Sequence, residues 1–176
     1  MRRLPFVVGA FLLAGVLLQA QRAAGAAQPT MVIETVKGII EVQLYATDVP
    51  KSVAHIVALV NRGFYRSQRF HRVTPTLVQF GDPLSRNMTQ QQAWGSGNSN
   101  NPINVAEIVP KYKHLRGTVA LANIGDPKLS DSHMYIMKTS SPSLDGKYTI
   151  IGKVTKGIEV VDKIERTDLI RLVSVK

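Results

Sequence analysis

The chain of 176 residues contains no cysteine. It therefore has no disulfides and no thiol nucleophile, and its domain must be stable through its hydrophobic core alone. A chain of this length can bury a full core, and it suits a single domain. The sequence shows no internal repeat and no second domain.

Residues typical of several kinds of chemistry are also missing. No G-x-S-x-G motif marks a serine nucleophile, and no spacing marks a pair of catalytic carboxylates. The histidines fall at no metal-binding spacing; they are His55, His71, His114 and His133. We therefore expect no metal and no cofactor, and any reaction must proceed without a nucleophile or a metal.

The N-terminus holds the most hydrophobic segment of the chain. Two arginines precede an apolar stretch from Leu4 to Leu18, and the segment ends in small residues at Ala24-Gly25-Ala26. This pattern is typical of a secretory signal peptide. We expect cleavage near Ala26 or Ala27, with a signal peptide at 1–27 and a domain at 28–176 in an exported, periplasmic protein. An uncleaved membrane anchor is the alternative, because a spanning helix needs about 20 apolar residues.

Acidic residues are few, 12 against 22 basic ones, so the formal net charge is +10. Three of the arginines lie in the predicted signal peptide, which contains no acid, so the remaining domain carries +7 (10 − 3). Such a charge favours anionic surfaces in general. The chain has no long Lys/Arg run, and an exported protein rarely meets nucleic acid, so we expect no nucleic-acid partner.

Alternating polar and apolar residues predict short strands over most of the domain. Residues 31–35 and 39–45 flank a Gly38 turn as a hairpin, and further strands are expected at 69–73, 77–80, 117–121, 133–138, 148–154 and 169–175. Two segments change to helical spacing. Pro50 begins the first helix and Gly63 ends it, and a second short helix is expected at 157–165. Eight strands and two helices favour a mostly antiparallel closed barrel.

The polar stretch 84–104 fits neither a strand nor a helix. It is rich in Gly and Asn and contains Trp94, the only tryptophan. A loop of some twenty residues inside a compact domain is usually functional or disordered.

Five segments in order resemble the cyclophilin-type peptidyl-prolyl isomerases, particularly the shorter bacterial kind. They are GIIEVQLYATDVPKSVAHIVALVNRGFY, RFHRVTP, GDP, YKHLRGTVALAN and LDGKYTIIGKV, and the resemblance extends from about Met31 to Lys176. It implies a closed, eight-stranded antiparallel β-barrel capped by two α-helices, with the active site on its outer surface. It also implies a monomer that isomerises X-Pro bonds of exported, unfolded client proteins.

In that family the arginine of F-H-R is catalytic, so the resemblance assigns catalysis to Arg72. It assigns the apolar part of the substrate site to a set of candidate residues: Phe70, Leu77, Val78, Met134, Tyr135, Leu144 and Tyr148. The polar candidates are Gln79, Asn123 and His133.

Three of these positions depart from the family pattern. Leu77 stands at an aromatic position, His133 replaces a glutamine, and Tyr135 replaces a phenylalanine and brings a hydroxyl that needs a partner if buried. These changes favour an alternative in which the domain is a weak or inactive isomerase that binds proline-containing segments. The retained Arg72 favours the enzyme.

Overall fold

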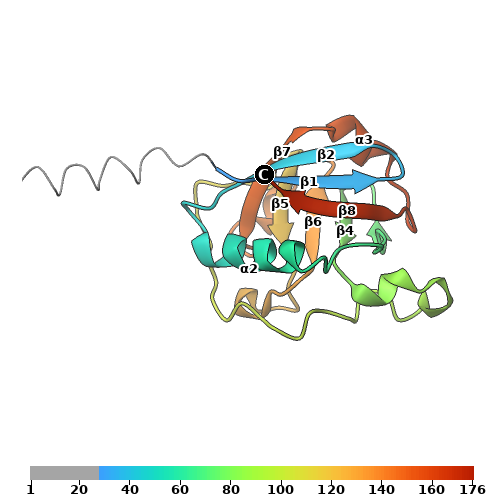
Figure 1. The fold of residues 1–176 in the computed structure, drawn as a ribbon. Coiled ribbons are helices and arrows are strands. Elements are labelled where there is room, and N and C mark those ends of the chain that lie inside the picture. The colour runs from blue at the N-terminus through green and yellow to red at the C-terminus, as the bar shows by residue number, and fades with distance from the viewer. Residues whose placement is uncertain (1–27) are drawn as a thin grey trace, which may run out of the picture.

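The structure is a computed structural model, and it describes residues 28–176; the predicted signal peptide lies outside the described residues. Eight strands form one antiparallel sheet in the order β3-β4-β6-β5-β7-β2-β1-β8 (Figure 1). The first four strands in the chain are β1 (Thr30–Thr35), β2 (Ile39–Leu44), β3 (Arg72–Val73) and β4 (Leu77–Phe80). The others are β5 (Thr118–Leu121), β6 (Met134–Met137), β7 (Ile150–Lys156) and β8 (Ile170–Val175).

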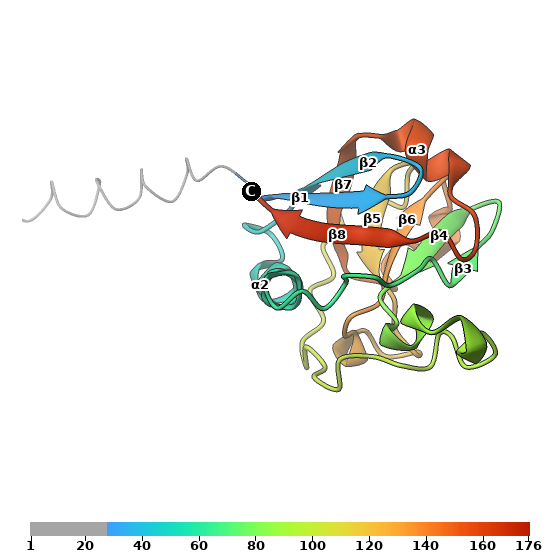
Figure 2. The ribbon, with the colours of Figure 1, turned by 45° about the vertical axis from the view of Figure 1, so that its right-hand side comes forward.

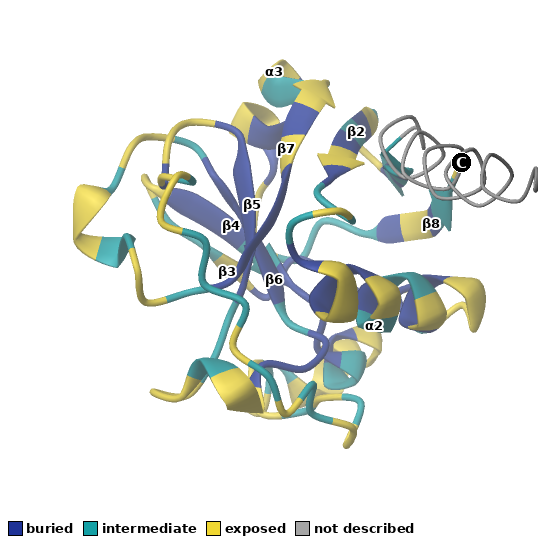
Figure 3. Cartoon of the chain, turned by 90° about the vertical axis from the view of Figure 1, so that its left-hand side faces the viewer, coloured by how far each residue is buried: buried dark blue, intermediate teal, exposed yellow. Residues whose placement is uncertain are grey.

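Within the described residues two α-helices accompany the sheet, α2 (Pro50–Asn61) and α3 (Ile158–Lys163), and they lie at opposite ends of it (Figure 1). As expected, α2 has Pro50 in its first turn, where the missing N–H costs nothing. The chain leaves it through Gly63 at φ +69°, a left-handed conformation that favours glycine. Its buried positions Val53, Ile56 and Val60 follow the helical period, while its outer face is exposed (Figure 3).

The sheet is a half-barrel, so the expected closed barrel is not what the structure shows. Its edge strands β3 and β8 form no ladder. They are joined through the isolated bridge of Arg69 with Leu169 and through neighbouring backbone hydrogen bonds such as Ile170 N–H to Gln68 O, 2.8 Å. Strand β3 is only two residues long and ends shortly before Pro75, so it offers too little backbone to pair with β8 along its length.

The central strands of the sheet, β5 and β6, are buried on both faces (Figure 3). On β6, Met134 and Ile136 pack into the main core with the inward residues of β1 and β2. Tyr135 and Met137 point to the other face, into a smaller apolar cluster with Leu77. Side chains from the segments before β5 and before β7 cover this second cluster: Tyr112, Leu144 and Tyr148.

The polar stretch 84–104 follows β4, and in Figure 2 its first part lies below β3 and β4, to the right of α2. It begins with two short 3₁₀ helices, Pro83–Arg86 and Met88–Gln90. None of the helices in residues 28–176 combines the length and the apolar composition that crossing a membrane requires.

Candidate active site

A cavity of about 200 Å³, called cavity A here, opens beside the smaller apolar cluster. Strands β3, β4 and β6, the turn after β5 and the segment before β7 contribute its lining. The lining residues are Arg72, Leu77, Gln79, Ala122, Asn123, Tyr135, Leu144 and Tyr148. Apart from Ala122, each was predicted from the sequence as a site residue.

A row of three paired residues crosses cavity A. Arg72 on β3 lies directly opposite Gln79 on β4, and Gln79 lies opposite Tyr135 on β6. Directly opposed residues of antiparallel strands point to the same face of a sheet. The sheet register therefore aligns a guanidinium, an amide and an aromatic ring along one cavity.

The guanidinium of Arg72 is at the rim of cavity A. Its Nη1 donates a hydrogen bond to Oε1 of Gln79, 3.2 Å away, and the side chain is exposed. The charge is thus hydrated in the free protein, and Gln79 orients it. The fork keeps further N–H groups that a substrate can use.

The apolar wall of cavity A consists of Leu77, Leu144 and two tyrosine rings. Tyr135 is only 3% exposed, and its ring meets that of Tyr148 edge to face at 89°, with centroids 5.7 Å apart. Leu144 ends the short 3₁₀ helix Pro142–Leu144. The wall has the size and the chemistry to hold a small apolar ring.

Three predicted site residues lie elsewhere. Phe70, Val78 and Met134 are fully buried in the main core and line neither cavity described here. Val78 and Met134 alternate with Gln79 and Tyr135 along their strands, so they point to the opposite face. Phe70 precedes β3 and packs edge to face against Phe80, with ring centroids 5.4 Å apart.

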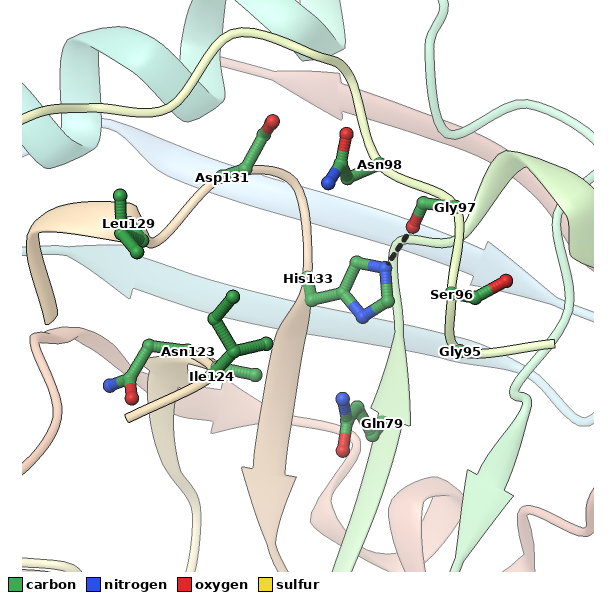
Figure 4. A pocket seen from close by; sticks show the side chains of 11 residues that line it. Gln79, Gly95, Ser96, Gly97, Asn98, Asn123, Ile124, Leu129, Asp131 and His133 are labelled. Carbon is green, nitrogen blue, oxygen red and sulfur yellow. Dashed lines mark hydrogen bonds between the residues drawn. The ribbon is translucent and has the colours of Figure 1, made fainter. Parts of the chain in front are cut away.

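His133 lines a second cavity of about 290 Å³, called cavity B here (Figure 4). It shares Gln79, Ala122 and Asn123 with cavity A. The remaining lining comes from residues 95–98 of the polar loop and from Ile124, Leu129 and Asp131. The Nε2 atom of His133 is 2.5 Å from the carbonyl oxygen of Gly97. Because a carbonyl only accepts, this nitrogen carries the proton.

Buried carboxylates hold the polar loop against the sheet. Asp82, fully buried, accepts hydrogen bonds from the backbone N–H of Leu84, 2.7 Å away, and from that of Gly95. Asp131 accepts from Ser99 and from the backbone N–H of Asn101. Both acids therefore serve to shape cavity B.

Arg166, which sequence reasoning missed, clamps the same loop from the other side. It donates hydrogen bonds to the carbonyl oxygen of His71 at 3.1 Å and to the side chain and carbonyl oxygen of Gln91 at 3.1 and 3.2 Å. Its guanidinium also lies 5.2 Å from the ring centroid of Trp94. No local pattern announces this contact, because the partners are 72 or more positions away from Arg166.

His71 is a buried neighbour of the site. Both of its ring nitrogens lack a hydrogen-bond partner, and its ring centroid lies 5.0 Å from that of His133. Burial, and next the nearby His133, lower the pKa of His71 to about 4. The imidazole is thus neutral at pH 7. In residues 28–176 no three of the His, Asp and Glu side chains gather closely enough to hold a metal ion.

Comparison with known proteins identifies the family. The sequence profile described as "Cyclophilin type peptidyl-prolyl cis-trans isomerase/CLD" matches residues 30–175. A probable peptidyl-prolyl cis-trans isomerase of Brucella suis is 37% identical over 153 residues, which cover 84% of this chain and 78% of that protein. A peptidyl-prolyl cis-trans isomerase of Helicobacter pylori is 33% identical over 144 residues, or 80% of this chain and 83% of the relative.

The fold agrees with this assignment. A solved cyclophilin-type isomerase of Cryptosporidium parvum superposes with a TM-score of 0.72 at 24% sequence identity, over 84% of this chain and 98% of that one. The chain belongs to the cyclophilin-type peptidyl-prolyl cis-trans isomerase family. The resemblance seen in the sequence is therefore confirmed, and the chain has the function of this class, isomerisation of the peptide bond before proline.

Proposed function

We propose that cavity A holds the proline ring of an exported client protein and that Arg72 drives isomerisation of the preceding bond. The observation that carries this proposal is the row of Arg72, Gln79 and Tyr135 across the cavity. It brings a charged donor and an apolar wall to the lining of one cavity of about 200 Å³. The Cryptosporidium parvum protein was crystallised in the presence of the dipeptide Ala-Pro, which supports a proline-containing ligand.

The chemistry needs only electrostatics and shape. Rotation about an X-Pro bond is slow because amide resonance must be lost. In the twisted transition state the prolyl nitrogen regains its lone pair and becomes a better hydrogen-bond acceptor. A guanidinium held by Gln79 and aimed at that nitrogen binds the transition state more tightly than the ground state.

The lowering of the activation barrier can be divided between the charge of Arg72 and binding in cavity A. An acceleration of about five decades corresponds to about 7 kcal/mol, at about 1.36 kcal/mol per decade. A charged hydrogen bond contributes about 1.5 to 3 kcal/mol. The remainder must come from binding the ring in the cavity and from donors such as Gln79 and Asn123 that orient the flanking peptide.

The location of the protein is part of the proposal. The signal-like residues 1–27 support export to the periplasm, where the domain assists folding as a monomer without a nucleic-acid partner. N-terminal sequencing of the exported protein tests this part. An N-terminus near Gln28 is expected, and an intact Met1 on a membrane-bound protein contradicts it.

Exchange spectroscopy by NMR on an Ala-Pro peptide tests the reaction. The protein should accelerate cis-trans exchange, and Arg72→Ala should lower the exchange rate at saturating peptide about 10²-fold. Arg72→Lys keeps the charge but loses the fork, and it should fall between them. Peptide that binds without accelerated exchange would instead support the proline-binding module.

A further inference from the structure

The hydroxyl of Tyr135 leads away from cavity A into a buried chain of hydrogen bonds. Its Oη is 2.9 Å from Nε2 of His114, and Nδ1 of the same imidazole is 2.9 Å from Oδ1 of Asp145. His114 is 1% exposed and Tyr135 is 3% exposed. Both side chains therefore find their hydrogen-bond partners within the protein.

Asp145 sets the tautomer of His114. The same Oδ1 accepts the backbone N–H of His114 at 2.8 Å, and this backbone bond, followed by the bond to the His114 ring, lowers the pKa of Asp145 below its usual range. The ionised carboxylate can only accept, so Nδ1 of His114 carries the proton. In the neutral imidazole Nε2 is then the acceptor, and the hydroxyl of Tyr135 must donate to it.

These hydrogen bonds also connect separate parts of the wall of cavity A. Asp145 directly follows Leu144, whereas Tyr135 belongs to β6, and His114 bridges the two. The ring of Tyr148 packs edge to face on both Tyr135 and His114, with centroids 5.7 and 6.1 Å away. The three wall residues are thus held around one buried imidazole.

We propose that His114 and Asp145 are positioning residues for the proline site, which act through Tyr135 by holding its hydroxyl away from cavity A. Cavity A then presents the ring of Tyr135 to the proline, as a phenylalanine would. Burial raises the pKa of Tyr135 above its usual range, so the group stays a phenol that needs an acceptor. This inference rests on the proposed function, because it takes cavity A as the site of the proline ring.

Substitution of His114 removes the only acceptor that the described residues give this hydroxyl. In His114→Leu the hydroxyl of Tyr135 has to find another acceptor, either by turning toward cavity A or by binding a water molecule. Either change disturbs the wall of cavity A, so proline binding should weaken. We expect the dissociation constant of an Ala-Pro peptide to rise about tenfold. The exchange rate at saturating peptide should change much less, because Arg72 and Gln79 are not altered.

The double variant His114→Leu/Tyr135→Phe separates positioning from general packing. Without the hydroxyl there is nothing left to orient, so the dissociation constant should return to that of Tyr135→Phe alone. A double variant that binds as weakly as His114→Leu would overturn the inference. So would a folded His114→Leu protein, as judged by its thermal unfolding, that binds the peptide normally.

A spectroscopic measurement on the unmodified protein is independent of activity and of the folding of variants. The ¹⁵N and ¹H signals of the His114 ring should show a proton on Nδ1 and none on Nε2, and Tyr135→Phe should shift the Nε2 signal. A proton on Nε2 would overturn the inference. Failure of the proposed function looks different, since the unmodified protein would then not accelerate exchange, whatever the tautomer of His114.

Asp145→Asn provides a conservative second variant. It keeps an oxygen for the backbone N–H of His114 but loses the charge that selects the tautomer. We expect weaker peptide binding than in the unmodified protein and no further loss when Tyr135→Phe is added. Unchanged binding together with unchanged His114 ring signals would contradict the role of Asp145.

Discussion

Arg72 donates its hydrogen bond to the one residue that lies directly opposite it on the neighbouring strand, Gln79. The distance between Nη1 and Oε1 is 3.2 Å, and the sheet register fixes the pairing. Because Gln79 lines both cavity A and cavity B, it connects the proposed catalytic charge with both cavities.

Loss of this contact should affect the reaction rate. In Gln79→Ala the guanidinium gains freedom, and a hydrogen bond worth about 1 kcal/mol predicts an exchange rate at saturation about fivefold lower. NMR exchange on an Ala-Pro peptide measures it. Gln43→Ala, on an exposed position of β2, serves as the control and should have no effect. Equal rates in both variants would contradict the orienting role of Gln79.

Arg166 should control the order of the polar loop. Arg166→Ala removes a cation-π contact and three hydrogen bonds, a local loss of about 2 kcal/mol or more. The emission of Trp94, the only tryptophan, should shift to the red as the ring becomes hydrated, and protease cleavage within 84–104 should become faster. Arg171→Ala, at an exposed position of β8, is the matched control. An unchanged emission spectrum would show that Arg166 does not hold the loop.

His71 should make the stability depend on pH. Its pKa of about 4 in the folded protein is below the unfolded value of about 6.5, so the unfolded state binds the proton first as the pH falls. The contribution of His71 to the free energy of unfolding is therefore fully present above about pH 6.5. It is lost as the pH falls toward 4, and the loss is on the order of 3 kcal/mol.

Urea unfolding at pH 7, 5.5 and 4.5 measures this loss. The variant His71→Phe has no imidazole to protonate, so its free energy of unfolding should fall less over the same interval. Lowered carboxylate pKa values, such as that of Asp145, act at lower pH and remain in both proteins. If the two proteins lose stability in parallel, His71 is not the responsible group.

Gly81 should tolerate no side chain. It has φ +113°, and a Cβ there would lie 2.2 Å from the carbonyl oxygen of Ser132. Gly81→Ala should cost roughly 3 kcal/mol or more, from the clash and the left-handed backbone together. Gly63 also has a positive φ, +69°, but a Cβ there would meet no atom within 4 Å, so Gly63→Ala should cost only about 1 kcal/mol. Urea unfolding compares them, and equal losses would argue that the clash is relieved.

Local patterns in the sequence were sufficient for most of the fold. Alternation placed the hairpin of β1 and β2, and Pro50 with Gly63 placed α2, because such signals act through neighbouring residues. The closed barrel was predicted wrongly. Closure depends on how far β3 can pair with β8, two segments almost a hundred residues apart, and no local pattern reports that length.

The sequence by itself determined the family and predicted every lining residue of cavity A except Ala122. Only the tertiary structure decided that Phe70 and Met134 belong to the core. It alone also showed that the hydroxyl of Tyr135 is bound to His114. The physical reason is that a strand's alternation gives two faces without saying which faces a cavity, while a hydrogen bond between distant residues exists only once the chain is packed.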